Sequence, residues 1–214
     1  MNELKPLSEL LLGLALFLGT HSIRLVSESA RTRLIEGAGE KAYKLGYTAL
    51  SLMGLGLIVH GFGVAREAPT VLWNVPTAGR HFASLLMLFA IILLVASFVP
   101  RNIFKAKLKH PMLLSVKVWA LAHLLANGLL ADLLLFGSFL LWAVLDFRAL
   151  RQRDRAQAEA LAGRPDGAAV AVAGAPTTST PAGTVTAVVV GAALWALLLA
   201  YLHQKLFGVS PLGR

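Results

Sequence analysis

The sequence has no cysteine and few charged residues, and both shortages exclude classes of function. Without a thiol, the chain can form no disulfide, no cysteine-ligated zinc site and no cysteine-held iron–sulfur cluster. Charged residues make up 14% of its 214 residues, whereas a soluble domain carries about 25%. Hydrophobic residues reach 57%, and the mean hydropathy is +0.69. This composition argues against a water-soluble domain and favours a membrane protein.

Motifs of hydrolases and NTPases are absent too. The chain has no phosphate-binding loop, no nucleophile elbow and no HExxH zinc helix. The net charge of +9 would suit nucleic acid. However, the basic residues lie between apolar runs, where lysine and arginine set membrane topology and contact anionic headgroups. We therefore expect the lipid bilayer, and no nucleic acid, as a partner.

Apolar runs near the length of about 20 residues that a helix needs to cross a bilayer recur along the chain. They predict an all-α polytopic membrane protein with a five-span core and a sixth, C-terminal span. The expected spans are residues 7–26, 45–65, 79–99, 112–127, 129–147 and 185–207. The fourth span is short, and a tight turn at Asn127 and Gly128 would join it to the fifth.

Lysine and arginine gather in the loops after the first, third and fifth predicted spans. These residues are Arg24, Arg31, Arg33, Lys41 and Lys44, then Arg101, Lys105, Lys107 and Lys109, then Arg148, Arg151, Arg153, Arg155 and Arg164. Cytoplasmic loops carry such an excess of positive charge. We therefore expect a multi-pass protein of the bacterial inner membrane with both termini in the periplasm.

The predicted domains follow from a change of composition near the C-terminus. Residues 1–155 hold the five-span core, and residues 185–214 hold the last span and the tail. Between them, residues 156–184 are rich in alanine, glycine, proline and threonine. Such a stretch buries too little apolar surface to offset its ordering entropy. We expect it to be a flexible cytoplasmic linker.

Histidines inside the predicted spans are the main candidates for chemistry. An ionisable group in hydrocarbon is costly and is a functional-site hypothesis by default. His21 and His123 are both in predicted spans, and neutral imidazole is the commonest metal ligand. With no cysteine, the pattern favours imidazole-only ligation of a metal or haem. The alternative is that these side chains form hydrogen bonds between helices or at helix ends.

The residues near His21, and the position of His123 in its span, bear on whether each histidine is a ligand. Phe17, His21 and Arg24 share one helix face, which suits ring contact, axial ligation and propionate pairing with a haem. His123 lies about 18 Å along the chain from the helix start at His110, and we expect it to be deep in the membrane.

Three further residues could contact a cofactor or could have ordinary roles at the membrane surface. His60, flanked by glycines in the second span, competes for the position of second ligand. His110 precedes Pro111 at a helix start, and Lys117 lies two turns from the basic end of its span. Contacts with headgroups, or snorkelling of the lysine, would explain both residues equally well.

Several motifs on successive spans resemble those of the NnrU family. This bacterial membrane family shares a domain with the plastid and cyanobacterial 15-cis-zeta-carotene isomerases. The motifs are His21-Ser22, Gly39-Glu40-Lys41-Ala42-Tyr43, Ser51-Leu52, His110-Pro111 and Trp119-Ala120-Leu121-Ala122-His123. The resemblance covers about residues 7–155.

The resemblance implies haem b with His21 and His123 as axial ligands. Two neutral imidazoles on different helices can hold an iron from opposite faces, as axial histidines do in other haem proteins. Arg24, His110 and Lys117 are then the candidate propionate contacts. If the first span ends near Arg24, His60 becomes the better partner for His123.

The activity that the resemblance implies is redox-linked. It would be the handling of nitric oxide in denitrification or a haem-dependent isomerisation of a hydrophobic polyene. The alternative is a haem-free assembly or accessory protein for a respiratory or denitrification complex, with its histidines bonded between helices. The redox partner and the substrate are not encoded in any motif.

Overall fold

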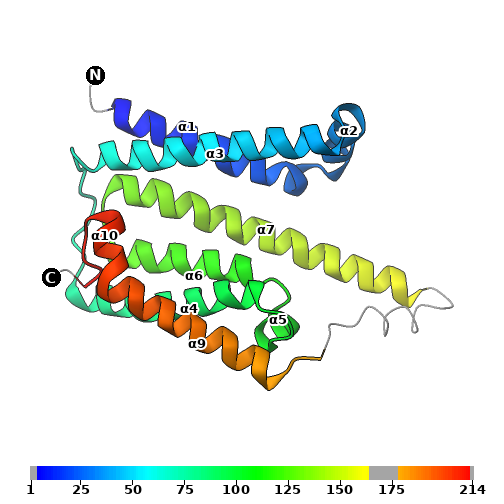
Figure 1. Ribbon diagram of the computed structural model, residues 1–214. Helices are drawn as coiled ribbons and strands as arrows, with labels where there is room; N and C mark the ends of the chain where they lie inside the picture. Colours follow the sequence, from blue (N-terminus) through cyan, green and yellow to red (C-terminus); the bar gives the residue numbers. More distant parts are fainter. Residues whose placement is uncertain (1–3, 164–177, 213–214) are drawn as a thin grey trace. The chain divides into compact units, whose positions relative to one another are not determined.

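The computed structural model describes residues 4–163 and 178–212, with side chains from Leu7 onward, and these residues are mostly helical (Figure 1). The elements are α1 (Leu4–Val26), α2 (Glu28–Ala38), α3 (Glu40–Ala65), α4 (Thr77–Phe98), α5 (Ile103–Leu108), α6 (Pro111–Ala126), α7 (Leu130–Ala162), α9 (Pro181–Leu197), the π-helical turn η1 (Leu198–Leu202) and α10 (His203–Phe207). No β-strand occurs in the described part of the chain; one isolated β-bridge joins Val71 to Leu129.

Five stretches of helix are long and apolar enough to cross a bilayer. They are Leu7–Val26 of α1, α3, α4, α7 and the continuous run Pro181–Phe207. α6 is apolar but has 16 residues, about 24 Å of helix against about 30 Å of hydrocarbon. The chain is therefore an all-α polytopic membrane protein, as predicted, and the predicted fourth span is the short one.

Helical structure extends beyond several predicted boundaries. α7 does not stop near residue 147 but continues as one helix to Ala162, into the segment predicted to be a linker (Figure 1). Alanine, arginine, glutamine and glutamate fill this extension, and all are strong helix formers, so the helix persists until Gly163. α9 begins at Pro181, before the predicted linker end. Residues 164–177, the rest of that segment, lie outside the described residues.

Two short helices occupy basic loops for which no helix was predicted. Each begins at a side chain that caps its first turn. Ser27 Oγ accepts a hydrogen bond from the Ala30 amide at 3.1 Å at the start of α2. Asn102 Oδ1 accepts one from the Lys105 amide at 2.9 Å at the start of α5.

The chain divides into two compact units, each described by itself. The first unit comprises Met1–Val75 and His123–Trp142, and the second comprises Pro76–Ala122 and Ala143–Arg214. The first unit thus contains α1, α2 and α3 with the α6–α7 turn, and the second contains α4, α5 and α9.

In the first unit, α1 and α3 pack antiparallel with their backbones in contact. A Cβ added to Gly54 would lie 2.7 Å from the Phe17 amide nitrogen, and one added to Gly13 would lie 2.6 Å from the Ile58 amide nitrogen. Gly61 meets the backbone of Leu10 in the same way. Small residues permit such close approach between membrane helices.

The turn between α6 and α7 is held by the loop that follows α3. The Leu130 amide donates to the Thr70 carbonyl at 2.9 Å, and the Leu72 amide donates to the Gly128 carbonyl at 2.8 Å. Asp132, only 4% exposed, accepts a hydrogen bond from the Leu129 amide at 3.1 Å. The tight turn predicted at Asn127 and Gly128 is confirmed.

In the second unit, α9 packs directly against α4. Gly191 lies so close to α4 that an added Cβ would be 2.7 Å from the Ile92 Cα. The Trp195 indole nitrogen donates to the Ser84 carbonyl at 2.9 Å. The last span, which the sequence suggested to be an appendage, is thus a packed part of this unit.

Candidate functional site

Three aromatic side chains of α7 connect the two candidate histidines within the first unit. Phe136, Phe139 and Trp142 recur at every third position, so each is a neighbour of the next on the helix surface; we call them the aromatic row. The His123 ring stacks on Phe136, with ring centroids 4.5 Å apart. The Trp142 ring meets His21 edge to face at 6.2 Å.

His21 is oriented by its own helix. Its Nδ1 lies 2.8 Å from the carbonyl oxygen of Phe17, one turn earlier. The Phe17 ring stacks on the imidazole at 4.3 Å, and Tyr47 of α3 contacts it at 5.2 Å. In the neutral imidazole, Nδ1 then carries the proton and Nε2 carries the lone pair. Ligating histidines in metal sites are held by such bonds to a carbonyl.

His123 lies in the last turn of α6, close to the α6–α7 turn. Its carbonyl oxygen accepts a hydrogen bond from Asn127 Nδ2 at 2.8 Å, and its ring rests on Phe136, which is buried. α6 ends at Ala126, one turn beyond His123; that this histidine lies deep in the membrane stays a prediction.

His60 has a carboxylate partner of its own. Its Nδ1 lies 2.7 Å from Glu9 Oε2, and its side chain is 69% exposed. Glu9 and His21 are both on α1, about 18 Å apart along the axis. α1 does end near Arg24, at Val26, but His60 lies beside Glu9, at a different level of the bundle from His21.

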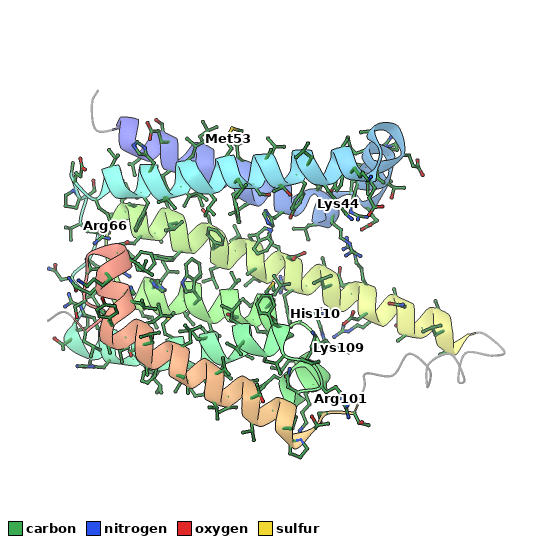
Figure 2. The ribbon with its side chains drawn as sticks, in the orientation of Figure 1. Lys44, Met53, Arg66, Arg101, Lys109 and His110 are labelled. Atoms are coloured by element: carbon green, nitrogen blue, oxygen red, sulfur yellow. The ribbon has the colours of Figure 1, made fainter. Side chains whose placement is uncertain are left out.

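The three candidate propionate contacts have different surroundings. Arg24 lies one turn beyond His21 on α1, is exposed, and pairs with Glu28 at 2.9 Å. His110 and Lys117 belong to the second unit. His110, at the start of α6 (Figure 2), lies 3.1 Å from Asp154 Oδ2, and Lys117 Nζ lies 3.8 Å from the centroid of Phe147. Among the three, the first unit contains only Arg24.

No group of three or more histidine, cysteine, aspartate or glutamate side chains could hold a metal ion among the described residues. A conventional protein metal site of three or four ligands is therefore not formed within residues 4–163 and 178–212. In the first unit, His21 and His123 each contact a ring of the aromatic row, whereas His60 pairs with Glu9.

Trp142 is a further residue beside His21 that was not a candidate from the sequence. Its indole nitrogen is buried and has no hydrogen-bond partner in the described structure. The signal in the sequence is the three-residue spacing from Phe136 through Phe139 to Trp142, which places the indole next to the Phe139 ring on the helix surface.

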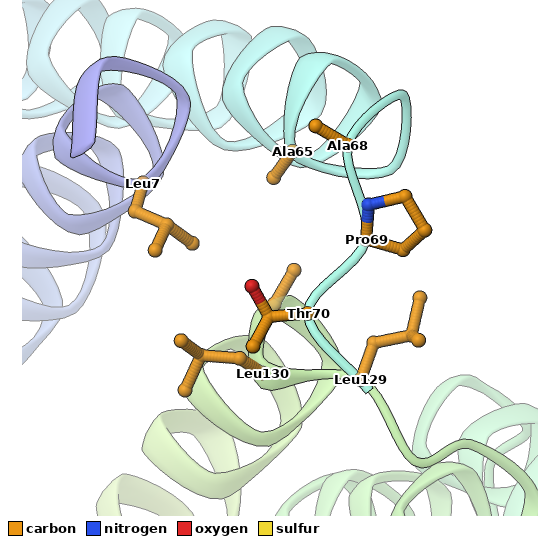
Figure 3. Close-up of a pocket in the computed structure, with 8 residues that line it drawn as sticks. Leu7, Ala65, Ala68, Pro69, Thr70, Leu129 and Leu130 are labelled. Carbon is orange, nitrogen blue, oxygen red and sulfur yellow. The ribbon is translucent and has the colours of Figure 1, made fainter. Parts of the chain in front are cut away.

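A separate cavity of about 290 Å³ lies at the other end of the first unit (Figure 3). It is lined by Leu7, Ala65, Ala68, Pro69, Thr70, Leu129, Leu130 and Ala131. Leu7 and His21 are about 21 Å apart along α1, so this cavity lies away from His21.

Comparison with known proteins places the chain in a family without supplying a characterised relative. The family model described as NnrU protein matches residues 9–211. The match continues past residue 155, where the motif resemblance stops, and so includes α9. No curated protein and no solved structure matches. With nearly its whole length matched, the chain belongs to the NnrU family.

Proposed function

We propose that this membrane protein binds one haem b in its first unit, with His21 and His123 as axial ligands. The observation that carries the proposal is the 2.8 Å contact between His21 Nδ1 and the Phe17 carbonyl. That hydrogen bond leaves the lone pair of Nε2 available to a metal and holds the ring in one orientation. The aromatic row adds apolar, flat surface against which a porphyrin can pack.

The distance along α7 between the two residues that the histidines contact shows that the rings must move when a haem binds. His123 contacts Phe136 and His21 contacts Trp142, and these two row residues are about 9 Å apart along the helix axis. Two imidazole nitrogens on one iron are about 4 Å apart, since each bond is about 2 Å. We expect the contact between Phe17 and Phe139, with centroids 5.7 Å apart, to open when the cofactor binds.

The activity that we propose is redox-linked, acting on nitric oxide or on a hydrophobic polyene. Held by His21 and His123, haem b would supply an iron that can change its oxidation state. The residues of the chain hold the ligating nitrogens, exclude water with apolar rings and keep the site within the membrane, into which both candidate ligands partition. Family membership supports the link to this chemistry.

An absorption spectrum tests the proposal. The full-length protein, purified in detergent from cells supplied with a haem precursor, should show a Soret band and the pyridine haemochrome of haem b. His21→Ala and His123→Ala should each shift or abolish the band. His60→Ala is the matched control, because this histidine pairs with Glu9, and it should leave the spectrum unchanged.

Two results would overturn the proposal. One is a wild-type protein that stays colourless after incubation with haemin. The other is a coloured protein whose spectrum is the same in both alanine variants. A colourless, folded protein would favour the accessory role, with the histidines acting as structural hydrogen-bond partners.

A further inference from the structure

The indole of Trp142 is a hydrogen-bond donor without an acceptor. Its Nε1 is shielded from solvent, and no described atom receives its proton. Buried donors are almost always satisfied, so an exception calls for an unseen partner. A bridging water would need two or more further polar partners.

A second tryptophan, Trp195, has an indole N–H whose hydrogen bond is purely structural. Trp195 Nε1, in the second unit, donates to the Ser84 carbonyl at 2.9 Å. That bond links α9 to α4 and needs no ligand. Trp142 therefore differs from Trp195 in having no acceptor within the described protein.

The position of Trp142 narrows the chemistry of the missing acceptor. The indole ring meets the His21 ring edge to face at 6.2 Å, with an angle of 89° between the planes. Arg24 lies one turn beyond His21 on α1, toward the basic loop. An acceptor at this position would meet the indole N–H, and a charged acceptor such as a carboxylate makes a stronger hydrogen bond with that donor than a neutral group does.

We propose that Trp142 Nε1 donates a hydrogen bond to a propionate carboxylate of the haem that His21 ligates, an inference that rests on the proposed function. A carboxylate offers only acceptor atoms, and a charge-assisted bond to it in a membrane interior is strong. Trp142 is a cofactor-positioning residue in this arrangement, since it fixes the rotation of the porphyrin about the axis through the iron.

The test compares haemin with haemin dimethyl ester, in which both carboxylates are blocked. Each is titrated into the full-length apoprotein in the same detergent, and the Soret absorbance gives the dissociation constant. Wild type should bind haemin more tightly than the ester. Trp142→Phe should weaken haemin binding about tenfold or more, as expected for loss of a hydrogen bond to a charged group, and leave binding of the ester within about twofold.

Two further variants guard against a general loss of structure. Trp195→Phe loses an indole of the same size in the second unit and should keep the wild-type preference for haemin. Trp142→Gln retains a side-chain N–H donor and should restore part of the preference that Trp142→Phe has lost. Unchanged ester binding shows that each variant is folded.

The outcomes separate this inference from the proposed function. If Trp142→Phe keeps the wild-type ratio of the two affinities, Trp142 does not bind a carboxylate, and haem binding itself stands. If Trp142→Gln binds haemin as weakly as Trp142→Phe while both still bind the ester, the hydrogen-bond role is also wrong. If the wild type binds neither porphyrin, the proposed function and this inference fall together.

Discussion

His21 and Phe17 hold each other in two ways. The Nδ1 atom of His21 lies 2.8 Å from the Phe17 carbonyl oxygen, and the two rings stack with centroids 4.3 Å apart. The backbone bond selects the tautomer, and the ring contact limits rotation of the imidazole. A side chain held in this way loses little further entropy when its Nε2 binds a metal, which is why the pair is central to the proposed site.

Replacing Phe17 with alanine should destabilise the first unit without removing the His21 hydrogen bond, because that bond uses a backbone carbonyl. Loss of a buried phenylalanine costs roughly 3–5 kcal/mol; Phe17 is half-buried, so we expect about 2 kcal/mol in the free energy of unfolding, measured by denaturant titration in detergent. Phe89→Ala is the control, since this side chain is 52% exposed. Equal losses in the two variants would contradict the packing described here.

The glycines of α3 allow a test with two substitutions on one helix. Gly54→Ala should destabilise the protein by about 1–3 kcal/mol, the usual cost of overpacking, because its Cβ would lie 2.7 Å from the Phe17 backbone. Gly56 has no atom within 4 Å of an added Cβ. Gly56→Ala should therefore be neutral or stabilise the helix by about 0.5–1 kcal/mol. Thermal unfolding of both variants measures these changes in stability. A Gly54→Ala variant as stable as the wild type would show that α1 and α3 are further apart than described here.

Asp132 closes the first turn of α7 and should be sensitive to loss of its acceptor atom. Its Oδ2 accepts the Leu129 amide at 3.1 Å in a capping arrangement. Asp132→Ala should lower the free energy of unfolding by about 1 kcal/mol or somewhat more, as cap deletions do. Asp132→Asn keeps an acceptor and should cost less. Equal losses in the two variants would mean that the negative charge, rather than the hydrogen bond, matters here.

The absence of cysteine makes the predicted topology easy to test. A single cysteine at Glu67, in the exposed loop after α3, should react with a membrane-impermeant maleimide in right-side-out vesicles. A cysteine at Lys107, in the basic and exposed part of α5, should react only after the vesicles are opened, since basic loops remain in the cytoplasm. Labelling in the opposite order would invert the proposed orientation.

Length and apolar character were enough to predict the order of the apolar helices, five of which are long enough to cross a bilayer, with α6 as the short one. They did not predict where α7 ends. The apolar run stops near Phe147, but helix propensity continues through residues such as Gln152 and Ala156, and only Gly163 interrupts it. Hydropathy marks the membrane boundary, which is not the end of this helix.

Contacts between distant segments could not be predicted from the sequence. Glu9 and His60 are ordinary polar residues in separate spans until α1 and α3 pack antiparallel and bring them within 2.7 Å. The loop that pairs with Leu129 and Leu130 shows no strand pattern, and its bonds depend on the position of the α6–α7 turn. His21 and His123 were candidates from the sequence alone, whereas the buried donor of Trp142 emerges only from packing.

The glycine contacts along α1 and α3 also restrict how anything large could reach His21. From Leu10 to Phe17 the two backbones touch at Gly13, Gly54 and Gly61, so a larger residue at any of these positions would push one helix away from the other. A planar molecule as wide as a porphyrin could not pass between α1 and α3 along this seam unless the two helices separated.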